Sequence, residues 1–512
     1  MTAHADSARK RQCLTLIYAA FAAGLCSIIY ELLIATTVSY FLGDGVKYFS
    51  LTIGIYMAAM GVGSLVSKYI DKQLLPVFLT AELWLAALGG LSIPALYFAY
   101  AYDLYFLPLY GILTAAIGFL IGLEIPFLTR LMEQYSQLKI SIANVLSFDY
   151  FGALIATVAF PFILLPFFGV YQSSLLFGLV NLSIAFVLLA VFSHAFHRRR
   201  LLWGFALALT VLLGGMMLFS GALLRHWDQV LYTDRIVWSG QSLYQRIVLT
   251  RGKGDVRLFL NGNLQFSSTD EYRYHEALVQ VPLALSPNPI QRVLLLGAGD
   301  GLAVRELLKH KSIVHITLVE LDEQIIKLAR QNPAITDLNG HSLTSARVEV
   351  VIGDAFTFLQ DNHEAFDLII ADMPDPNNAE LARLYSKQFY TLLRLNLAPH
   401  GLLATQATSP YFATDAFWSI AATVQAAGFD HLYPYHVDVP SFGDWGFVLA
   451  ANLPLDPDAP ELDVPTRFLS ADNFGSLFHF GKDVAYRQVD VNQLDNPKLL
   501  TYYLQGWQRY GN

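Results

Sequence analysis

The sequence contains few charged residues. Lys, Arg, Asp and Glu together make up 14% of the 512 residues, whereas hydrophobic residues make up 54%. This composition is too apolar for a soluble protein of the same length. The formal net charge of -8 also argues against a nucleic-acid partner. We therefore expect part of the chain to lie in a lipid bilayer, and we do not expect a nucleic-acid partner.

Cysteine is nearly absent as well. The two cysteines, Cys13 and Cys26, both lie in the first apolar segment, so they cannot cross-link the rest of the chain. They are interpreted as small apolar packing residues. The sequence shows no His, Cys, Asp and Glu cluster with metal-ligand spacing, so we expect no metal site.

The apolar residues are concentrated in the first 224 positions. A membrane-spanning helix needs roughly 20 apolar residues. The first candidate span is too long for a cleavable signal and is followed by others, so it is interpreted as a span. We predict a multi-pass transmembrane domain at residues 1–225 with about seven helices. The predicted spans are Leu14–Phe41, Tyr48–Val66, Leu74–Tyr97, Leu104–Leu128, Ile142–Leu165, Ser173–Phe192 and Leu201–Leu224.

Basic residues fall on alternate connections between these spans. They are Arg9–Arg11, Lys68 with Lys72, Arg130 with Lys139, and Arg198–Arg200. The positive-inside rule places all of them in the cytoplasm, and seven spans would then place everything after Leu224 outside. The substrate inferred below is made in the cytoplasm, so we expect a cytoplasmic catalytic domain, which the count of basic residues with seven spans contradicts. We expect a multi-pass protein of the cell inner membrane, and three explanations of the conflict stay open: a re-entrant segment near Pro161 and Pro166, an exception to the rule, or an external domain.

Four acids lie within or near the ends of the predicted spans: Glu31, Glu82, Glu124 and Asp149. Intramembrane acids are costly and are often functional. One interpretation is a path for a cation such as a polyamine. The other is a set of hydrogen bonds between helices.

From Ser242 onward the pattern becomes that of a soluble α/β domain. Ser242–Thr250 and Val256–Leu260 are predicted strands joined by a glycine-rich turn, and Asn263–Phe266 is a third. Glu271–Leu285 is a predicted helix. We assign residues 226–290 to a linker and a β-hairpin subdomain.

Strands and helices then alternate through residues 291–512, which predicts a Rossmann-like parallel sheet covered on both faces. Leu432–Val437 and Gly446–Ala450 predict an antiparallel edge. The expected parallel strands are Arg292–Leu296, His315–Val319, Val348–Val351, Phe366–Ala371 and Gly401–Thr405. The expected helices are Leu302–Lys309, Asp322–Arg330, Ala355–Gln360, Ala379–Asn396 and Thr414–Ala427.

Ligands of such sheets bind at the carboxyl ends of the strands. The first strand is followed by the glycine loop GAGDG (297–301), the second by Glu320, and the third by Asp354. A glycine loop admits a ligand close to the backbone, Glu320 suits ribose hydroxyls, and Asp354 suits an adenine amine. The full G-x-G-x-x-G pattern of dinucleotide sites is missing. The pattern therefore favours an adenosine without a pyrophosphate, as in adenosylmethionine chemistry.

The fourth strand ends in two acids, Asp372 and Asp375, within the stretch ADMPDP (371–376). A carboxylate beside the reactive end of a bound nucleoside could take a proton from an amine nucleophile. The second carboxylate could anchor another ammonium group of the same substrate. The alternative is that these acids only cap a helix beginning near Asn377.

At this point the sequence resembles the spermidine synthase family of polyamine aminopropyltransferases. The resemblance covers roughly Leu243 to Ala450, and the apolar first half resembles the membrane-attached bacterial members. The DEYRYHE stretch and the hairpins before it are not expected of a methyltransferase with the same core fold. The matching stretches are SLYQ (242–245), LFLNGNLQ (258–265), DEYRYHE (270–276), VLLLGAGDG (293–301), VELD (319–322), GDA (353–355), DLIIADMPDP (367–376), LYSKQFY (384–390) and GLLATQ (401–406).

The resemblance implies that an amine attacks the methylene beside the sulfonium of decarboxylated S-adenosylmethionine, a co-substrate, and that no other cofactor takes part. Asp372 is then the proton acceptor. The implied donor-binding residues are Gln245, Asp300, Glu320 and Asp354, framed by Gly297 and Gly299. The implied residues for the amine or the aminopropyl group are Gln265, Tyr274, Asp375 and Gln406, and His275 could bond either ligand.

Some positions depart from the family pattern. Asn261 stands in place of an aspartate, and Gln280 in place of a common histidine. The stretch VPSFGDWGF (439–447) lacks the tyrosine that helps to seat the diamine, while Asp438 and Asp444 add acids that could meet an ammonium group. Putrescine is the default acceptor, and cadaverine, spermidine or another amine stay open.

The sequence thus predicts a spermidine synthase that uses small-molecule substrates, with the bilayer as a partner of its first half. Soluble relatives commonly associate through the hairpins, so a homo-oligomer is a further possibility. Two alternatives stay open: an S-adenosylmethionine-dependent methyltransferase, and a membrane polyamine transporter or sensor whose soluble half only binds ligand.

Overall fold

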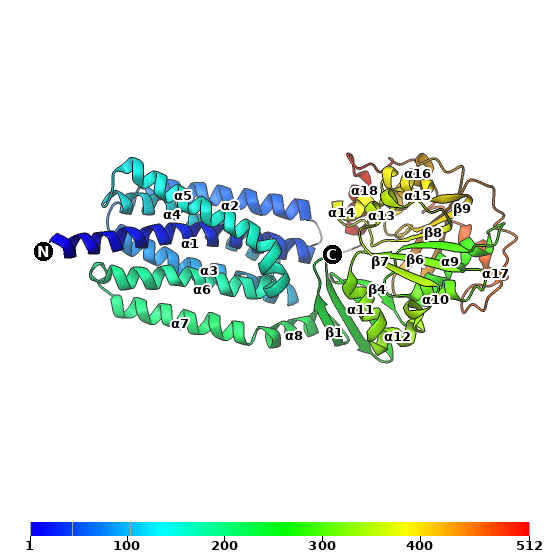
Figure 1. The fold of residues 1–512 in the computed structure, drawn as a ribbon, viewed down its shortest axis with the longest axis horizontal. Coiled ribbons are helices and arrows are strands. Elements are labelled where there is room, and N and C mark those ends of the chain that lie inside the picture. The colour runs from blue at the N-terminus through cyan, green and yellow to red at the C-terminus, as the bar shows by residue number, and fades with distance from the viewer. Residues whose placement is uncertain (1, 43–44, 103, 511–512) are drawn as a thin grey trace. The chain divides into compact units, whose positions relative to one another are not determined.

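The computed structural model describes residues 2–42, 45–102 and 104–510 (Figure 1). The chain forms two compact units, Met1–Asp234 and Arg235–Asn512. The first is entirely helical in its described part, and the second contains two β-sheets.

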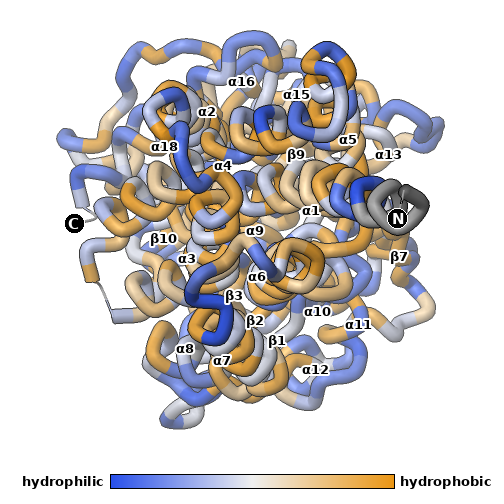
Figure 2. Tube along the Cα trace, turned by 90° about the vertical axis from the view of Figure 1, so that its left-hand side faces the viewer, coloured by the Kyte–Doolittle hydropathy of each residue, from blue (hydrophilic) through white to orange (hydrophobic). Residues whose placement is uncertain are grey.

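The first unit is a bundle of long helices in which hydrophobic residues predominate (Figure 2). Six helical segments are long and apolar enough to cross a membrane, rather than the seven predicted. The difference arises because the predicted spans Ile142–Leu165 and Ser173–Phe192 belong to one helical run, Leu138–Val191. The helices are α1 (Thr2–Leu42), α2 (Gly45–Ser67), α3 (Leu74–Ala101), α4 (Phe106–Glu133), α5 (Leu138–Ala159), α6 (Leu165–Val191), α7 (Arg199–Leu218) and α8 (Ser220–Leu231).

The run Leu138–Val191 is sharply bent. A π-helical turn, Phe160–Leu164, separates α5 from α6, and Gly169 has φ 64° and ψ 178°, which is not helical. The start of α5 lies near the start of α1, where the Arg9 guanidinium donates to the Tyr135 carbonyl. Helix α6 is antiparallel to α1, because Tyr18 bonds Ser183 while Tyr30 donates to the Phe177 carbonyl. The two limbs therefore run in opposite directions, as Figure 1 shows, and helices α1 to α7 each pass along the bundle once.

The bundle interior contains two of the four predicted intramembrane acids. Glu82 of α3 and Glu124 of α4 are buried. The Asn181 amide of α6 donates to both the carbonyl and the carboxylate of Glu82 at 2.9 Å. Glu82 therefore links two helices through hydrogen bonds, as one of the two interpretations of these acids expects.

The second unit begins with a four-stranded antiparallel sheet. Its strands pair in sequence order: β1 (Arg235–Gln241), β2 (Arg246–Gly252), β3 (Asp255–Leu260) and β4 (Asn263–Ser267). Strand β1 was not predicted, and Ser242–Gln245, predicted as strand, forms the β1–β2 turn instead, in which the Ser242 hydroxyl accepts from the Gln245 amide at 3.0 Å. The predicted β2–β3 turn is present, with positive φ at Lys253 and Gly254.

The main sheet has seven strands in the order β10-β11-β9-β8-β5-β6-β7. The central strands β5, β6 and β8 are buried on both faces, which explains their largely apolar sequences. The predicted Rossmann-like sheet with an antiparallel edge is confirmed. Its strands are β5 (Arg292–Gly297), β6 (His315–Glu320), β7 (Val348–Ile352), β8 (Phe366–Asp372), β9 (Leu397–Gln406), β10 (His431–Val439) and β11 (Gly443–Ala451).

Helices cover the main sheet on both sides (Figure 1). The single helix predicted over Ala379–Asn396 is wrong: a 3-10 turn, Arg383–Tyr385, follows α14, and Ser386 is extended and begins α15 with its hydroxyl as the cap. Helices α12, α17 and α18 were not predicted. The helices are α9 (Glu271–Ala284), α10 (Leu302–Leu308), α11 (Glu323–Gln331), α12 (Pro333–Asn339), α13 (Ala355–Asp361), α14 (Ala379–Ala382), α15 (Lys387–Leu395), α16 (Thr414–Ala426), α17 (Ala471–Phe474) and α18 (Lys498–Gln508).

Candidate active site

The register of the main sheet places the predicted site residues along one edge. Asp372 ends β8 directly opposite Gly297, which ends the neighbouring β5. Glu320 ends β6 on the far side of β5, and Gln406 ends β9 on the far side of β8. Because these strands are parallel, their carboxyl ends meet at the same edge. The fold therefore gathers side chains from four separate strands.

Gly297 is required by this geometry. Its φ is 79°, and an added Cβ would lie 2.1 Å from the Asp372 carbonyl oxygen. Any side chain there would be strained and would collide with the backbone of β8. The glycine thus lets the loop after β5 lie directly against the loop that carries the acids.

Asp372 is hydrogen-bonded by Tyr274 of α9. The Tyr274 hydroxyl donates to Asp372 Oδ1 at 2.5 Å, and its ring packs against Phe447 with a centroid separation of 5.2 Å. Burial raises the pKa of Asp372 to about 6, although the Tyr274 hydrogen bond and the nearby His275 oppose the rise. Burial and the Asp372 charge raise the pKa of Tyr274, so the phenol stays a neutral donor. Asp372 is therefore an oriented carboxylate whose pKa lies close to neutrality.

Asp375 accepts hydrogen bonds from three side chains of two segments, the end of β9 and α18. The Tyr503 hydroxyl of α18 donates to Oδ2 at 3.0 Å, Thr408 donates to Oδ2 at 3.3 Å, and the Gln406 amide donates to Oδ1 at 3.4 Å. Burial raises the pKa of this carboxyl to about 6 as well. The alternative that the two acids cap the next helix is wrong, because Asn378 caps α14 by accepting from the Leu381 amide at 2.8 Å.

The turn between the two acids is held by Gln406 and Tyr385. The Gln406 amide donates to the Met373 carbonyl at 2.7 Å and also bonds the Tyr385 hydroxyl. Tyr385 is buried and donates to the Met373 and Pro374 carbonyls at 2.9 and 3.0 Å. These contacts satisfy the carbonyls of the turn and fix the spacing of Asp372 and Asp375.

The opposite side of the glycine loop carries Glu320. An added Cβ at Gly299 would lie 2.7 Å from Glu320 Oε2, so the absence of a side chain lets this carboxylate reach the loop. Glu320 Oε1 accepts from the Asp322 amide at 3.0 Å, and burial raises the pKa of Glu320 to about 7. Gln245, from the β1–β2 turn, donates to Asp322 Oδ2 at 3.0 Å and so connects the small sheet to this corner.

His275 and Asp300 lie on a buried ionic cluster beside the loop. His275 Nδ1 bonds Glu271 Oε2 at 2.8 Å, and Arg305 pairs with both oxygens of Glu271 at 2.9 and 3.0 Å. Burial lowers the pKa of His275, but the Glu271 carboxylate outweighs it and raises the net value. Asp300 Oδ1 accepts from the Leu302 amide at 2.9 Å, and burial raises the pKa of Asp300. The cluster fixes the imidazole orientation.

Two predicted residues have other partners in this structure. Asp354 caps α13 by accepting from the Thr357 amide at 3.0 Å, and its second oxygen pairs with Arg383. The Gln265 amide donates to the Asn263 carbonyl of its own hairpin at 3.3 Å. Neither is joined to Asp372 or Asp375 by a hydrogen bond within the described part of the chain.

The extra acids of the β10–β11 hairpin are also engaged. Asp444 pairs with His436 at 2.6 Å. The exposed Asp438 lies 4.0 Å from the Arg273 guanidinium, which also donates to the Asp438 carbonyl at 2.8 Å. The expectation that these two acids meet an ammonium group finds no support in these contacts.

Sequence reasoning missed three side chains that contact the acids or their turn: Tyr385, Thr408 and Tyr503. Tyr385 lies in a stretch that resembles the family, but no role was inferred for it. Thr408 follows β9 with φ 56°, an uncommon conformation for threonine. Tyr503 lies about 130 positions after Asp375 on a helix without a motif, and no sequence signal identifies it.

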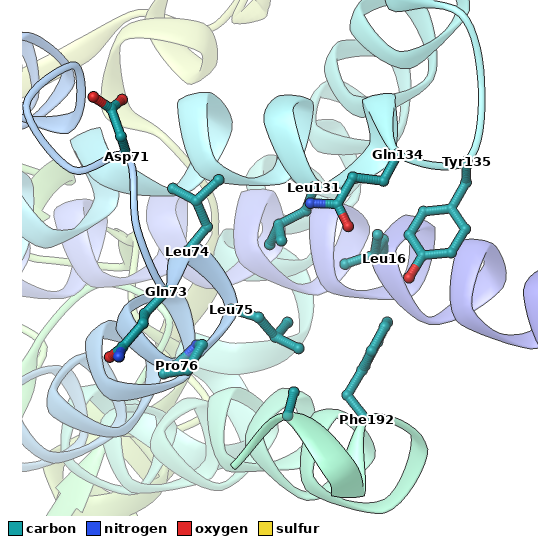
Figure 3. A pocket seen from close by; sticks show the side chains of 11 residues that line it. Leu16, Asp71, Gln73, Leu74, Leu75, Pro76, Leu131, Gln134, Tyr135 and Phe192 are labelled. Carbon is teal, nitrogen blue, oxygen red and sulfur yellow. The ribbon is translucent and has the colours of Figure 1, made fainter. Parts of the chain in front are cut away.

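The first unit has a hollow of about 450 Å³ at one end of its helices (Figure 3). Its lining combines apolar side chains such as Leu75 and Phe192 with the polar side chains of Gln73 and Gln134. Its one acid, Asp71, lies 3.6 Å from the Arg130 guanidinium. Because that acid is already paired, we place the chemistry at the sheet edge of the second unit.

Comparison with known proteins agrees with this placement. A model of the spermine/spermidine synthase domain matches residues 271–455. The polyamine aminopropyltransferase of Leptospira interrogans is 42% identical over 94% of this chain and 97% of its own. Polyamine aminopropyltransferase 2 of Ralstonia nicotianae is 43% identical over 96% and 98%. A crystal structure of a spermidine synthase with the transition state analogue AdoDATO aligns at 26% identity and TM-score 0.46, covering 49% of this chain and 87% of its own.

Proposed function

Because the chain belongs to the polyamine aminopropyltransferase family, and is thus a transferase, we propose that it moves the aminopropyl group of decarboxylated S-adenosylmethionine to putrescine. The products are spermidine and methylthioadenosine. The observation that carries this proposal is the pair Asp372 and Asp375, each hydrogen-bonded by a tyrosine, with Asp372 directly opposite Gly297 of the glycine loop.

The donor would bind along the edge formed by β5, β6 and β7. Glu320 has a free carboxylate face beside Gly299 and suits the two ribose hydroxyls. Asp300 would hold the donor at the loop, and Gln245 would act with Asp322, to which it is bonded. If Asp354 binds the adenine amine, its pairing with Arg383 has to loosen when the donor enters.

The transfer step forms a C–N bond and breaks a C–S bond. The amine nitrogen attacks the methylene beside the sulfonium, and the C–S electron pair passes to sulfur, which leaves as neutral methylthioadenosine. The attacking amine is protonated in water near neutral pH, with a pKa of about 10. Asp372 takes its proton, and the Tyr274 hydrogen bond keeps one carboxylate oxygen fixed while the other meets the amine.

Asp375 would anchor the second ammonium group of the acceptor. Both acids are partly buried, and burial raises the pKa of each to about 6, so ionised carboxylates are costly there. A diamine brings positive charge to this place and offsets that cost. The pair therefore favours a substrate with two amino groups, which Gln265 and His275 would help to position.

The direct test is release of methylthioadenosine by the full chain purified in detergent. It receives decarboxylated S-adenosylmethionine with putrescine, cadaverine or spermidine in separate reactions, and S-adenosylmethionine in a parallel set. We expect release only with the decarboxylated donor and an amine, fastest with putrescine. Methyl transfer from S-adenosylmethionine, or no reaction with any amine, would overturn the proposal.

We also propose that the first unit lies in the cell membrane and anchors the enzyme. Helices α2 and α7 expose large apolar side chains, among them Met57, Leu65, Val211 and Leu218, the last at 85% exposure. Such surfaces are costly in water and ordinary in lipid. The protein should stay in the membrane pellet after high-salt and alkaline washing and should be released by detergent; release by salt alone would contradict an integral anchor.

A further inference from the structure

Among the residues that the structure describes, Tyr503 is the one hydrogen-bond donor to the Asp375 side chain that comes from outside the region matched by the family model. That match covers residues 271–455, whereas Tyr503 lies on α18 (Lys498–Gln508). Its hydroxyl donates to Asp375 Oδ2 at 3.0 Å. The C-terminal helix therefore reaches the acid to which we assign the acceptor's second ammonium group.

The position of α18 is fixed by specific packing. An added Cβ at Gly506 would lie 2.7 Å from Ala413 Cα, so this glycine permits close contact with the segment before α16. The Trp507 and Phe412 rings stack with centroids 4.9 Å apart. Leu499 is fully buried, and its amide donates to Asn492 Oδ1 at 3.3 Å. The contact between Tyr503 and Asp375 therefore rests on a defined helix.

Asn492 ties this segment to the acid turn as well. Its side-chain amide donates to the carbonyls of Ala382 and Tyr385 at 2.9 and 3.1 Å. The Tyr385 hydroxyl in turn bonds the Met373 and Pro374 carbonyls between the two acids. The C-terminal segment thus contacts both the backbone support of the turn and the Asp375 carboxylate.

The β10–β11 hairpin lacks the tyrosine that the resemblance to the family leads one to expect there, so a phenol near the acids has to come from another element. It carries Phe442, which has no hydroxyl and whose ring packs against Trp445 at 5.3 Å. Asp372 already has Tyr274 as its phenol partner. Asp375 receives its phenol from α18, so each acid is oriented by one tyrosine from a different element.

We propose that Tyr503 is a positioning residue for acceptor binding: its hydroxyl holds Asp375 Oδ2 so that the carboxylate faces the acceptor's second ammonium group. The inference rests on the proposed function. A hydrogen bond to a carboxylate stabilises its ionised form, which is the form that binds an ammonium group. Tyr503 acts through Asp375 and takes no part in breaking the C–S bond.

The groups that face Asp375 limit the possible explanations of a pH effect. Besides the phenol of Tyr503, the negative charge of Asp375 acts on the phenols of Tyr274 and Tyr385. Burial is the main cause that raises the pKa of these two phenols. Those phenols are therefore neutral across the pH range of an activity assay. Loss of the Tyr503 hydroxyl removes one of three side-chain donors to the carboxylate and should shift the pH dependence of acceptor binding upward.

Tyr503→Phe tests the proposal, and Tyr502→Phe is its matched control. Tyr502 is the preceding residue of the same helix, and its hydroxyl also donates to a carboxylate, Asp490 Oδ2, at 2.9 Å, away from the acids. A hydrogen bond to a charged group is stronger than one between neutral groups, so its loss should be measurable in the acceptor KM. We expect Tyr503→Phe to raise the acceptor KM about tenfold at pH 7, with a smaller rise at pH 9, and to change kcat and the donor KM less than twofold.

The outcomes separate the inference from the function on which it rests. An unchanged acceptor KM and pH profile in Tyr503→Phe, with an active wild-type enzyme, would overturn the role of Tyr503 alone. Wild-type protein that releases no methylthioadenosine with any amine would overturn the proposed function. Equal loss in Tyr502→Phe, or a lowered melting temperature with a raised donor KM, would show that α18 acts only through stability and would also overturn the inference.

Discussion

Two carboxylates, Asp372 at the end of β8 and Asp375 in the turn that follows, carry the chemistry that we propose. Burial raises the pKa of Asp372 and Asp375 to about 6, while Tyr274 and Tyr503 donate hydrogen bonds that favour the ionised form. Burial is the larger effect in both cases. The result is a pair of acids that are ionised above neutrality but lose their charge in mild acid.

Activity should depend on pH with a defined sign. The proposed base works only when ionised, so kcat/KM for the acceptor should rise as pH increases through about 6. A further rise towards pH 9 follows from deprotonation of the amine itself. Initial rates of methylthioadenosine release between pH 5 and 9 provide the measurement. A rate that increases as pH falls below 6 would exclude Asp372 as the base.

The same raised pKa makes a prediction about stability. The folded protein holds the Asp372 proton more tightly than an unfolded chain does, where the usual value is 3.8. The stabilising effect of this acid is therefore complete below about pH 4 and is lost as pH rises through about 6. At pH 8 the ionised side chain costs up to about 3 kcal/mol, from 1.36 kcal/mol per pKa unit.

Asp372→Asn should accordingly be more stable than the wild type at pH 8 and equal to it near pH 4. Thermal melting of the full chain in detergent at both pH values measures the difference. Asp458→Asn, at an exposed acid, is the control and should change stability little at either pH. A destabilised Asp372→Asn at pH 8 would show that the carboxylate makes stabilising contacts that outweigh its burial.

At the scale of elements, the glycine loop between β5 and α10 serves two neighbours. Gly297 makes room for the Asp372 carbonyl, and Gly299 makes room for the Glu320 carboxylate. The two glycines therefore differ in what an added methyl group would disturb. A methyl group at Gly297 would displace the backbone at Asp372. A methyl group at Gly299 would displace the Glu320 side chain, to which we assign donor binding.

Gly299→Ala should weaken donor binding selectively. Its Cβ would lie 2.7 Å from Glu320 Oε2, so the carboxylate has to move. We expect the KM for decarboxylated S-adenosylmethionine to rise at least about tenfold, a loss of about 1.4 kcal/mol, with the acceptor KM changed less than threefold. Steady-state kinetics with each substrate varied in turn will show this. Gly475→Ala, whose added Cβ meets its closest neighbour at 3.9 Å, is the control.

How much the sequence reveals depends on whether an element is determined locally. The buried strands β5, β6 and β8 are largely apolar runs that end in a glycine or an acid, so both the centre of the sheet and its site edge could be predicted. Strand β1 could not, because it is an edge strand whose residues alternate between exposed and half-buried. The break at Ser386 was missed because the residues on either side of it are good helix formers.

The contacts of the site residues were less predictable than their positions. Asp372 and Asp375 follow from the end of β8, but Tyr503 reaches Asp375 only through the packing of α18, which no local pattern encodes. Asp354 was predicted to be free for a ligand, whereas tertiary structure brings Arg383 to it. Contacts between segments far apart in the chain depend on the whole fold, and a single sequence carries little signal for them.

At the scale of the whole molecule, the helical unit raises a question of sidedness. Most of its basic residues lie at the end where α1 begins, since Arg9 contacts Tyr135, and Arg130 contacts Ser67 and Ile70; Lys47, at the start of α2, lies at the other end. The positive-inside rule assigns that end to the cytoplasm. The seven passages of the chain bring the end of α7 to the opposite end of the bundle (Figure 1).

Reporter fusions before the first residue and after the last should therefore report opposite sides of the membrane. Alkaline phosphatase and a fluorescent protein that folds only in the cytoplasm, each fused at either end, provide the measurement. Both ends on the same side would show that the bent run Leu138–Val191 does not cross twice. The six long apolar segments would then equal the number of crossings.

The central claim is that Asp372 removes the proton from the attacking amine rather than helping to bind ligands. The most direct test compares wild-type and Asp372→Asn full-length protein in detergent, with methylthioadenosine release and donor affinity measured on the same preparations. We predict that the variant keeps its donor affinity within about threefold and loses at least about a hundredfold in rate. Rates similar to the wild type would contradict the claim and would favour a second unit that binds polyamine-related ligands without Asp372-dependent catalysis.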